Sequence, residues 1–121
     1  MSTPNVSSEE NVYDQLVLAD FPIVTKRETI ISGQNLVRGA ALGKITASGK
    51  LTLLDSGGAD GSQNPFAILV EDTDASGGDE VGSVYLSGKF NEDEMLFTTG
   101  DTADDFRDAF RALGIYLEGA Q

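Results

Sequence analysis

An acidic turn near the middle of the chain carries the residues that could bind a metal ion. The segment 71–80 reads EDTDASGGDE, and its Asp72, Asp74 and Ser76 have the spacing of the first ligands in a calcium-binding EF-hand loop. Such a loop needs a bidentate glutamate at its twelfth position, where this chain has Ser83. The flanking residues are typical of strands rather than of helices. The pattern therefore favours a solvated turn over a calcium site.

Two Ser-Gly-Lys triplets, at 48–50 and 87–89, raise the question of phosphate binding. A phosphate loop needs an upstream glycine at a fixed spacing, a Ser or Thr after the lysine, and a following helix. Neither triplet has these features. Adjacent carboxylates such as Glu92 and Asp93 point apart on a strand, so their closeness in sequence does not form an acid–base pair. None of these motifs predicts an enzyme.

Composition narrows the possible chemistry further. The 121 residues include no His and no Cys, so the commonest base at neutral pH, thiolate nucleophiles and the usual zinc ligands are all missing. Twenty acidic and eight basic residues give a net charge of -12, which repels nucleic acids and anionic membranes. No signal peptide or membrane-length apolar run is visible. We expect a soluble acidic protein without a cofactor or metal, whose partners are other proteins.

The N-terminal quarter predicts a flexible segment followed by an edge strand. Residues 1–12 are polar and lack apolar periodicity, which is typical of a chain that is disordered when free. The segment 16–31 reads LVLADFPIVTKRETII and is rich in β-branched and aromatic residues. Pro22 cannot donate to a strand ladder, so we expect an edge strand, or two short strands that bend at Phe21–Pro22.

The segment 32–53, SGQNLVRGAALGKITASGKLTL, is cut by four glycines and predicts strands joined by tight turns. Within it, residues 41–53 have the pattern of a hairpin. A three-residue loop at 48–50 would place Ala47 opposite Leu51 and give the hairpin one apolar face. Further strands are expected at 66–70 (central in the sheet), 81–90, 95–97 and 115–117.

One amphipathic helix is predicted near the C-terminal end. Thr102 is a good N-cap residue, Asp105 is its capping-box partner, and Gly114 is a helix stop. Between them, apolar residues recur at helical spacing and form one face: Phe106, Ala109, Phe110 and Leu113. This face fits either the core of the domain or a contact between subunits, and the sequence leaves both interpretations open.

Several segments together resemble the head decoration protein family of tailed bacteriophages, the family of the phage lambda head decoration protein D. They are DFPIVTKRETIISGQNLVRGAALGKITASGKL, the Asp60-Gly61 pair before PFAILVEDTDA, VYLSGKFNEDEM, and the helix that ends FRALGIYL. They occur in the order typical of the family and cover about residues 16–118. No single string is diagnostic, but their combination and order are specific.

The resemblance implies a mainly β fold: a small β-clip-like domain with one short C-terminal helix, assembled as a homotrimer. Such trimers sit at three-fold positions on the outer surface of the expanded head and hold the shell of major capsid protein against the pressure of packaged DNA. The N-terminal segment in this family is mobile in the free trimer and orders on the capsid. The resemblance implies no catalytic residues, no nucleic-acid partner and no membrane.

We therefore expect a flexible arm at residues 1–15 and a single β-rich domain at 16–121. Near their junction, the expected capsid-binding residues are Leu16, Leu18, Phe21, Pro22 and Ile23. The expected core or trimer face of the helix is Phe106, Phe110 and Leu113. The alternative is a free-standing β-module that binds a small ligand or calcium through its acidic loops.

Overall fold

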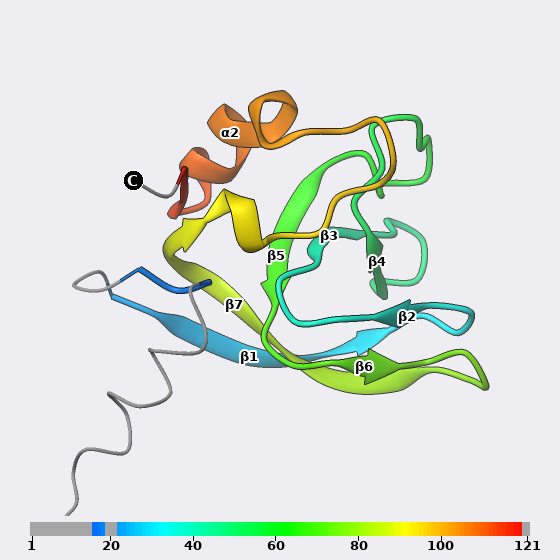
Figure 1. Cartoon of the computed structure of the whole chain (residues 1–121). Helices are drawn as coiled ribbons and strands as arrows, with labels where there is room; N and C mark the ends of the chain where they lie inside the picture. The colour runs from blue at the N-terminus through cyan, green and yellow to red at the C-terminus, as the bar shows by residue number, and fades with distance from the viewer. Residues whose placement is uncertain (1–15, 19–21, 120–121) are drawn as a thin grey trace, which may run out of the picture.

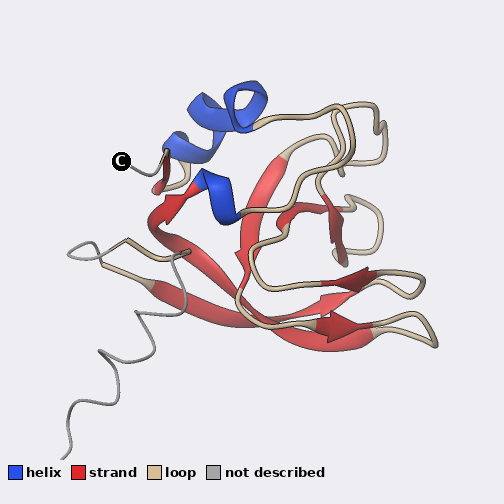
Figure 2. Cartoon of the chain, in the orientation of Figure 1, coloured by secondary structure: helices blue, strands red, loops and turns tan. Residues whose placement is uncertain are grey.

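The computed structural model describes residues 16–18 and 22–119. Within them it is mainly β with one short helix near the C-terminal end, as the sequence predicts (Figures 1 and 2). The elements are β1 (Val24–Ile30), β2 (Asn35–Leu36), β3 (Ala41–Lys44), β4 (Leu51–Leu53), β5 (Pro65–Leu69), β6 (Thr73–Asp74), β7 (Glu80–Asn91), the 3₁₀ helix η1 (Glu92–Glu94), α2 (Ala103–Ala112) and β8 (Ile115–Glu118).

The longest strand, β7, has different neighbours along its two halves. Its first half pairs antiparallel with β1 and β5, and its last residues, 88–91, pair in parallel with β8. The stretch 16–18 also pairs with these last residues, through an antiparallel bridge from Val17 to Phe90. A β-bulge where Val24 meets Ser87 separates the two halves. Bulges bend a strand and re-aim its side chains.

The larger sheet closes into a ring of five strands. Its order is β1-β4-β3-β5-β7, and the β1–β7 ladder joins the two ends, while β8 extends the sheet from β7. The contact between β1 and β4 is short, because only Ile30 pairs with Leu51. Strands β2 and β6 form a separate two-stranded sheet (Figure 1). The ring is therefore closed by an extended ladder between β1 and β7 but by only one residue pair between β1 and β4.

Two hydrophobic clusters fill the domain. One takes residues from all five strands of the ring, including Leu42, Leu51 and Val84. The other lies between β5, β7, β8 and α2 and contains Phe90 and Phe110, both fully buried. Figure 2 shows α2 at one end of the sheet. Within residues 16–18 and 22–119, no helix is both long and apolar enough to cross a membrane.

The C-terminal helix forms as the sequence predicts. The Thr102 backbone N–H donates to Asp105 Oδ2 at 2.8 Å, which is half of a capping box. After the helix, the Gly114 N–H donates to the Arg111 carbonyl, and the φ of this glycine is 90°. Strand β8 begins at the next residue. Ala109, which the sequence placed on the apolar face, is exposed.

The side chain of Arg107 fastens α2 to its neighbours. It donates to both carboxylate oxygens of Glu92 at 2.6 and 3.2 Å, to Asp104 at 2.5 Å, and to the Leu117 carbonyl of β8 at 2.6 Å. The two carboxylates raise the pKa of Arg107, with Glu92 as the larger cause. Since Arg107 occupies a backbone carbonyl of β8, it also covers part of the edge of that strand.

Two local predictions were wrong. Leu51 pairs with Lys44 rather than with Ala47, because residues 45–50 form a longer turn in which the Ile45 N–H donates to the Lys50 carbonyl. In this register both leucines of β4 lie on the same face of the hairpin as Leu42, and the three side chains pack in one apolar cluster. The segment 95–97 makes only a single bridge, from Leu96 to Ala40, instead of a strand.

The remaining strand predictions are confirmed. The central strand at 66–70 is β5, which lies between β3 and β7. The strands predicted at 81–90 and 115–117 are β7 and β8. Of the edge strand predicted within 16–31, β1 covers residues 24–30, and only its last residue, Ile30, pairs with a second strand. Val17 makes a separate bridge to β7, and the bend expected at Phe21 lies outside the described residues.

We predict that Phe110→Ala lowers the free energy of unfolding by roughly 3–5 kcal/mol, because it removes a fully buried aromatic ring and leaves a cavity. Chemical denaturation followed by circular dichroism measures the loss. Arg111→Ala, in the same helix but 62% exposed at its side chain, is the control and should change the value by less than about 0.5 kcal/mol. Equal losses in the two variants would contradict this account of the core.

Candidate assembly surface

Residues 16–18 lie along β7, the strand with which β1 also pairs. The Leu18 N–H donates to the Lys89 carbonyl at 2.8 Å, and the Leu16 carbonyl accepts from Asn91 N–H at 2.7 Å. Leu16 is only 2% exposed and belongs to the core, whereas Leu18 is half-buried. The hydrogen bonds fix the point at which the chain enters the domain.

Pro22, Ile23 and Val24 are held on the surface by one serine of β7. The Val24 N–H donates to Ser87 Oγ at 3.1 Å, and the Ser87 hydroxyl donates to the Pro22 carbonyl at 3.3 Å. The side chains of Ile23 and Val24 are 45% and 52% exposed. Phe21, another predicted capsid-binding residue, lies outside the described residues. Two of the predicted capsid-binding residues, Pro22 and Ile23, thus lie exposed at one point of β7.

The C-terminal end of α2 reaches the same place. The Gly88 N–H donates to the Gly114 carbonyl at 3.1 Å, which brings the end of the helix against β7. A Cβ atom placed on Gly88 would lie 3.6 Å from Cγ1 of Ile23, and one on Gly114 would lie 3.7 Å from Cβ of Ser87. Leu113, which precedes Gly114, is 46% exposed. The end of the helix and the start of β1 are therefore neighbours.

These contacts define a surface that we call the Ser87 junction: Pro22, Ile23, Val24, Ser87, Gly88, Leu113 and Gly114. It holds three of the six exposed large hydrophobic side chains found in the described part of the chain. The sequence analysis treated Ile23 as a capsid contact and Leu113 as part of a separate helix face. The structure brings Gly114, the residue after Leu113, against the part of β7 that also contacts Ile23, while Phe106 and Phe110 of that helix face are buried in the core.

Sequence reasoning missed the role of Ser87. The sequence favoured a turn or bulge over a phosphate loop for the Ser-Gly-Lys triplet at 87–89, but it did not show the partners of these residues. The serine links the start of β1 to β7, and the glycine admits the end of α2. The sequence has one usable signal for this site, which is a glycine inside a predicted strand. Such a glycine often marks a bulge or a close backbone approach.

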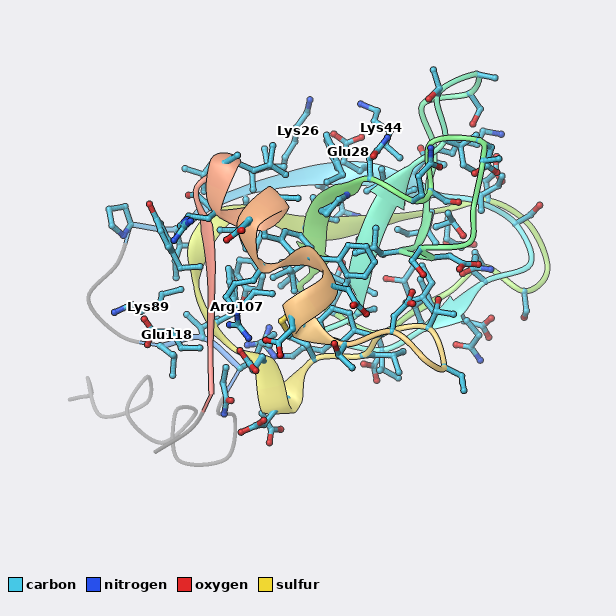
Figure 3. All side chains as sticks on the ribbon, turned by 90° about the horizontal axis from the view of Figure 1, so that it is seen from above. Lys26, Glu28, Lys44, Lys89, Arg107 and Glu118 are labelled. Atoms are coloured by element: carbon cyan, nitrogen blue, oxygen red, sulfur yellow. The ribbon has the colours of Figure 1, made fainter. Side chains whose placement is uncertain are left out.

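Two exposed basic side chains, Lys26 and Arg27, lie further along β1 from the junction. The side chains of Lys26 and Arg27 are each 64% exposed. Lys26 pairs with Glu28 at 3.5 Å and Arg27 with Glu71 at 3.7 Å, and exposed ion pairs of this kind contribute little. Figure 3 shows Lys26 beside Glu28, apart from Lys89, Glu118 and Arg107. β1 thus carries two exposed basic side chains, each beside a carboxylate, on a chain whose net charge is -12.

The carboxylates of the acidic turn already have partners within the protein. Asp72 accepts from the Arg38 backbone N–H at 2.9 Å, and Asp74 accepts from the backbone and the hydroxyl of Ser76 at 3.0 and 2.6 Å. The hydrogen bonds from Ser76 lower the pKa of Asp74. The described residues contain no group of three or more potential metal-ligating side chains of the His, Cys, Asp or Glu type. These contacts support the interpretation of the segment as a structured turn.

Another aspartate joins two distant loops. Asp101 accepts from the Ser56 backbone N–H at 2.9 Å and from its hydroxyl at 2.6 Å. The loop that follows β4 is thereby attached to the segment that precedes α2. The Ser56 hydroxyl, and then its backbone N–H, lower the pKa of Asp101.

Comparison with protein families identifies the chain. The model of the family described as Bacteriophage lambda head decoration protein D matches residues 6–116, which is most of the sequence. The chain belongs to this head decoration protein family. None of the curated proteins that were compared matches it.

Membership of the head decoration family gives the chain a role in a phage capsid. The family is structural rather than enzymatic, which agrees with the lack of His and Cys in the sequence. The Ser87 junction is therefore best examined as a surface for assembly. It joins the residues that carry the N-terminal segment to the end of the only α-helix found in the described residues.

We predict that Asp101→Asn lowers the melting temperature at pH 7 and that the difference from the original protein narrows below about pH 4. A carboxylate whose pKa is lowered by folding stabilises the protein above its unfolded pKa, and this contribution is lost as the pH falls through the folded pKa. Thermal unfolding at pH 7 and pH 3 measures both differences. Asp108→Asn removes the same charge from an exposed ion pair and is the control. A difference that is unchanged by acid would contradict the prediction.

Proposed function

We propose that this protein is a capsid decoration protein that binds as homotrimers to the outer surface of the expanded phage head. In this proposal the trimers occupy three-fold positions and stabilise the shell of major capsid protein against the pressure of packaged DNA. The observation that carries the proposal is the match of the head decoration family to residues 6–116. The β-rich fold with one C-terminal helix is consistent with a small β-clip domain of the kind that the resemblance implies.

The placement of residues 16–18 supports a role for the preceding segment as a capsid-binding arm. Hydrogen bonds to Lys89 and Asn91 hold residues 16–18 against β7, at the boundary that the sequence predicts between the arm and the domain. A homotrimer would present three such arms at once. When one arm binds, the effective concentration of the other two rises, and weak contacts then combine into strong attachment.

The charge of the chain suits an external position on the head. A net charge of -12 repels packaged DNA and keeps free copies from aggregating before they reach the capsid. The same charge argues against nucleic-acid and membrane partners. The partners in this proposal are the major capsid protein and two further copies of the chain.

The free protein should have three times the mass of the 12.8 kDa chain. Light scattering coupled to size-exclusion chromatography measures this mass directly. A monomer, especially one that calcium stabilises, would favour the alternative of a free-standing ligand-binding module and would contradict the trimer.

Deletion of residues 1–15 should leave a folded trimer that no longer decorates the expanded head. The deleted residues precede Leu16, the first core residue in the described part of the chain, so we expect the truncated chain to fold. The test mixes the truncated and the full-length protein with expanded, empty capsids of the phage that carries the gene. Cryo-electron microscopy then compares density at the three-fold positions. Full decoration by the truncated protein would rule out the arm.

A further inference from the structure

We propose that the pair Asp60–Gly61 is this chain's main site of spontaneous aspartate isomerisation, and that Ser62 and Gln63 suppress the reaction in the folded protein. The pair lies in the loop between β4 and β5. The inference concerns the chemical lifetime of the chain and does not depend on the proposed decoration function. It gives two loop side chains a protective role.

The reaction needs only the aspartate, the backbone nitrogen of the next residue, and water. The Gly61 nitrogen attacks Cγ of Asp60, and a C–N bond forms. A C–O bond of the uncharged carboxyl group breaks, and its hydroxyl leaves as water with the amide hydrogen of Gly61. Water then opens the five-membered imide at either carbonyl, which restores aspartate or gives isoaspartate of the same mass. Isoaspartate continues the chain through Cγ, so it lengthens the backbone of the loop by one carbon.

The sequence singles out this pair for the reaction. Asp60 is the only aspartate followed by glycine in the 121 residues, and no asparagine precedes a glycine. Glycine has no side chain that shields the attacking nitrogen, and its backbone adopts conformations that other residues avoid. Every other aspartate precedes a larger residue. We therefore expect the unfolded chain to isomerise mainly at Asp60.

The fold itself requires glycine at position 61. The φ of Gly61 is 111°, in the region that glycine adopts at little cost. A Cβ atom on this residue would lie 2.6 Å from Oγ1 of Thr46 and still closer to the Lys44 carbonyl oxygen. Because no larger residue fits there, the loop keeps the reactive pair, and protection has to come from neighbouring groups.

Ser62 holds the carboxylate of Asp60. Oδ1 of Asp60 accepts from the Ser62 backbone N–H at 3.1 Å and from the Ser62 hydroxyl at 2.6 Å. Ser62 is only 7% exposed, so packing fixes both donors in place. The hydroxyl, and then the N–H, lower the pKa of Asp60. They thereby reduce the uncharged fraction of the carboxyl group, which is the form that loses water.

Gln63 holds the attacking nitrogen. The Gly61 N–H donates to Oε1 of Gln63 at 2.9 Å. Ring formation removes this hydrogen from the nitrogen, so the hydrogen bond to Gln63 is lost. It also converts the carboxylate of Asp60 into an uncharged imide carbonyl, which is a weaker acceptor for the two Ser62 donors. The folded loop therefore opposes the reaction through three hydrogen bonds.

The test compares isoaspartate formation in the folded and the unfolded chain. The full-length protein is incubated at neutral pH with and without urea, and a protease that cleaves before aspartate but not before isoaspartate locates the product. In urea, we expect isoaspartate mainly at position 60. The folded protein should form it at least about a hundredfold more slowly, since three hydrogen bonds are lost or weakened in the imide.

Two variants test the protecting side chains. Ser62→Ala removes the hydroxyl donor, Gln63→Ala removes the acceptor of the glycine N–H, and each should speed isoaspartate formation in the folded protein about tenfold. Ser76→Ala is the matched control. Asp74 accepts from the Ser76 backbone and hydroxyl at 3.0 and 2.6 Å but precedes an alanine, so this variant should form no isoaspartate at position 74. Circular dichroism confirms that each variant is folded.

Three results would overturn the inference. Isomerisation of the folded protein as fast as in urea would show that the fold gives no protection. An unchanged rate in the folded variants would remove the roles of Ser62 and Gln63. Isoaspartate mainly at another position in urea would show that Asp60 is not the main site. If Ser62→Ala does not fold, Gln63→Ala decides the test, because Gln63 is only half-buried.

Discussion

The need to pair the backbone of one long strand determines most of this structure. β7 is twelve residues long, and its polar backbone groups need partners on both edges wherever the strand is buried. The chain meets this need with four different segments: β1 and residues 16–18, and β5 and β8. Because these segments come from both ends of the sequence, pairing with β7 brings the entry of the chain and its last strand together.

Elements that depend on interactions between residues close in sequence could be predicted, whereas those that depend on contacts between distant residues could not. The helix was predicted from Thr102, Asp105 and Gly114, whose effects act within a few residues. β5 was predicted because a short apolar run needs burial on both faces. The hairpin register was wrong because it depends on burial of Leu51 and Leu53 against Leu42, which is a property of the closed ring rather than of the local turn.

The candidate site was predictable only in part. The residues around Pro22 were selected because they are apolar residues next to a proline that cannot donate to a strand ladder, and that reasoning is local. Their position beside the end of α2 depends on hydrogen bonds from Gly88 to Gly114 and from Val24 to Ser87, between residues far apart in sequence. A single sequence without pairing information does not encode these partners in any short pattern. The surface therefore became visible only after the strands were paired.

Gly88 lies where the core meets the surface of the junction. A Cβ atom at this position would lie 2.7 Å from Cζ of Phe90, a fully buried ring, and 3.6 Å from Cγ1 of exposed Ile23. The backbone thus passes between a core aromatic ring and a surface side chain with no room for a larger residue. Since Phe90 is held by the core, the positions of β7 and Ser87 are fixed before any partner arrives. A surface that is already ordered loses less conformational entropy on binding, so modest apolar contacts there can contribute more of their free energy to attachment.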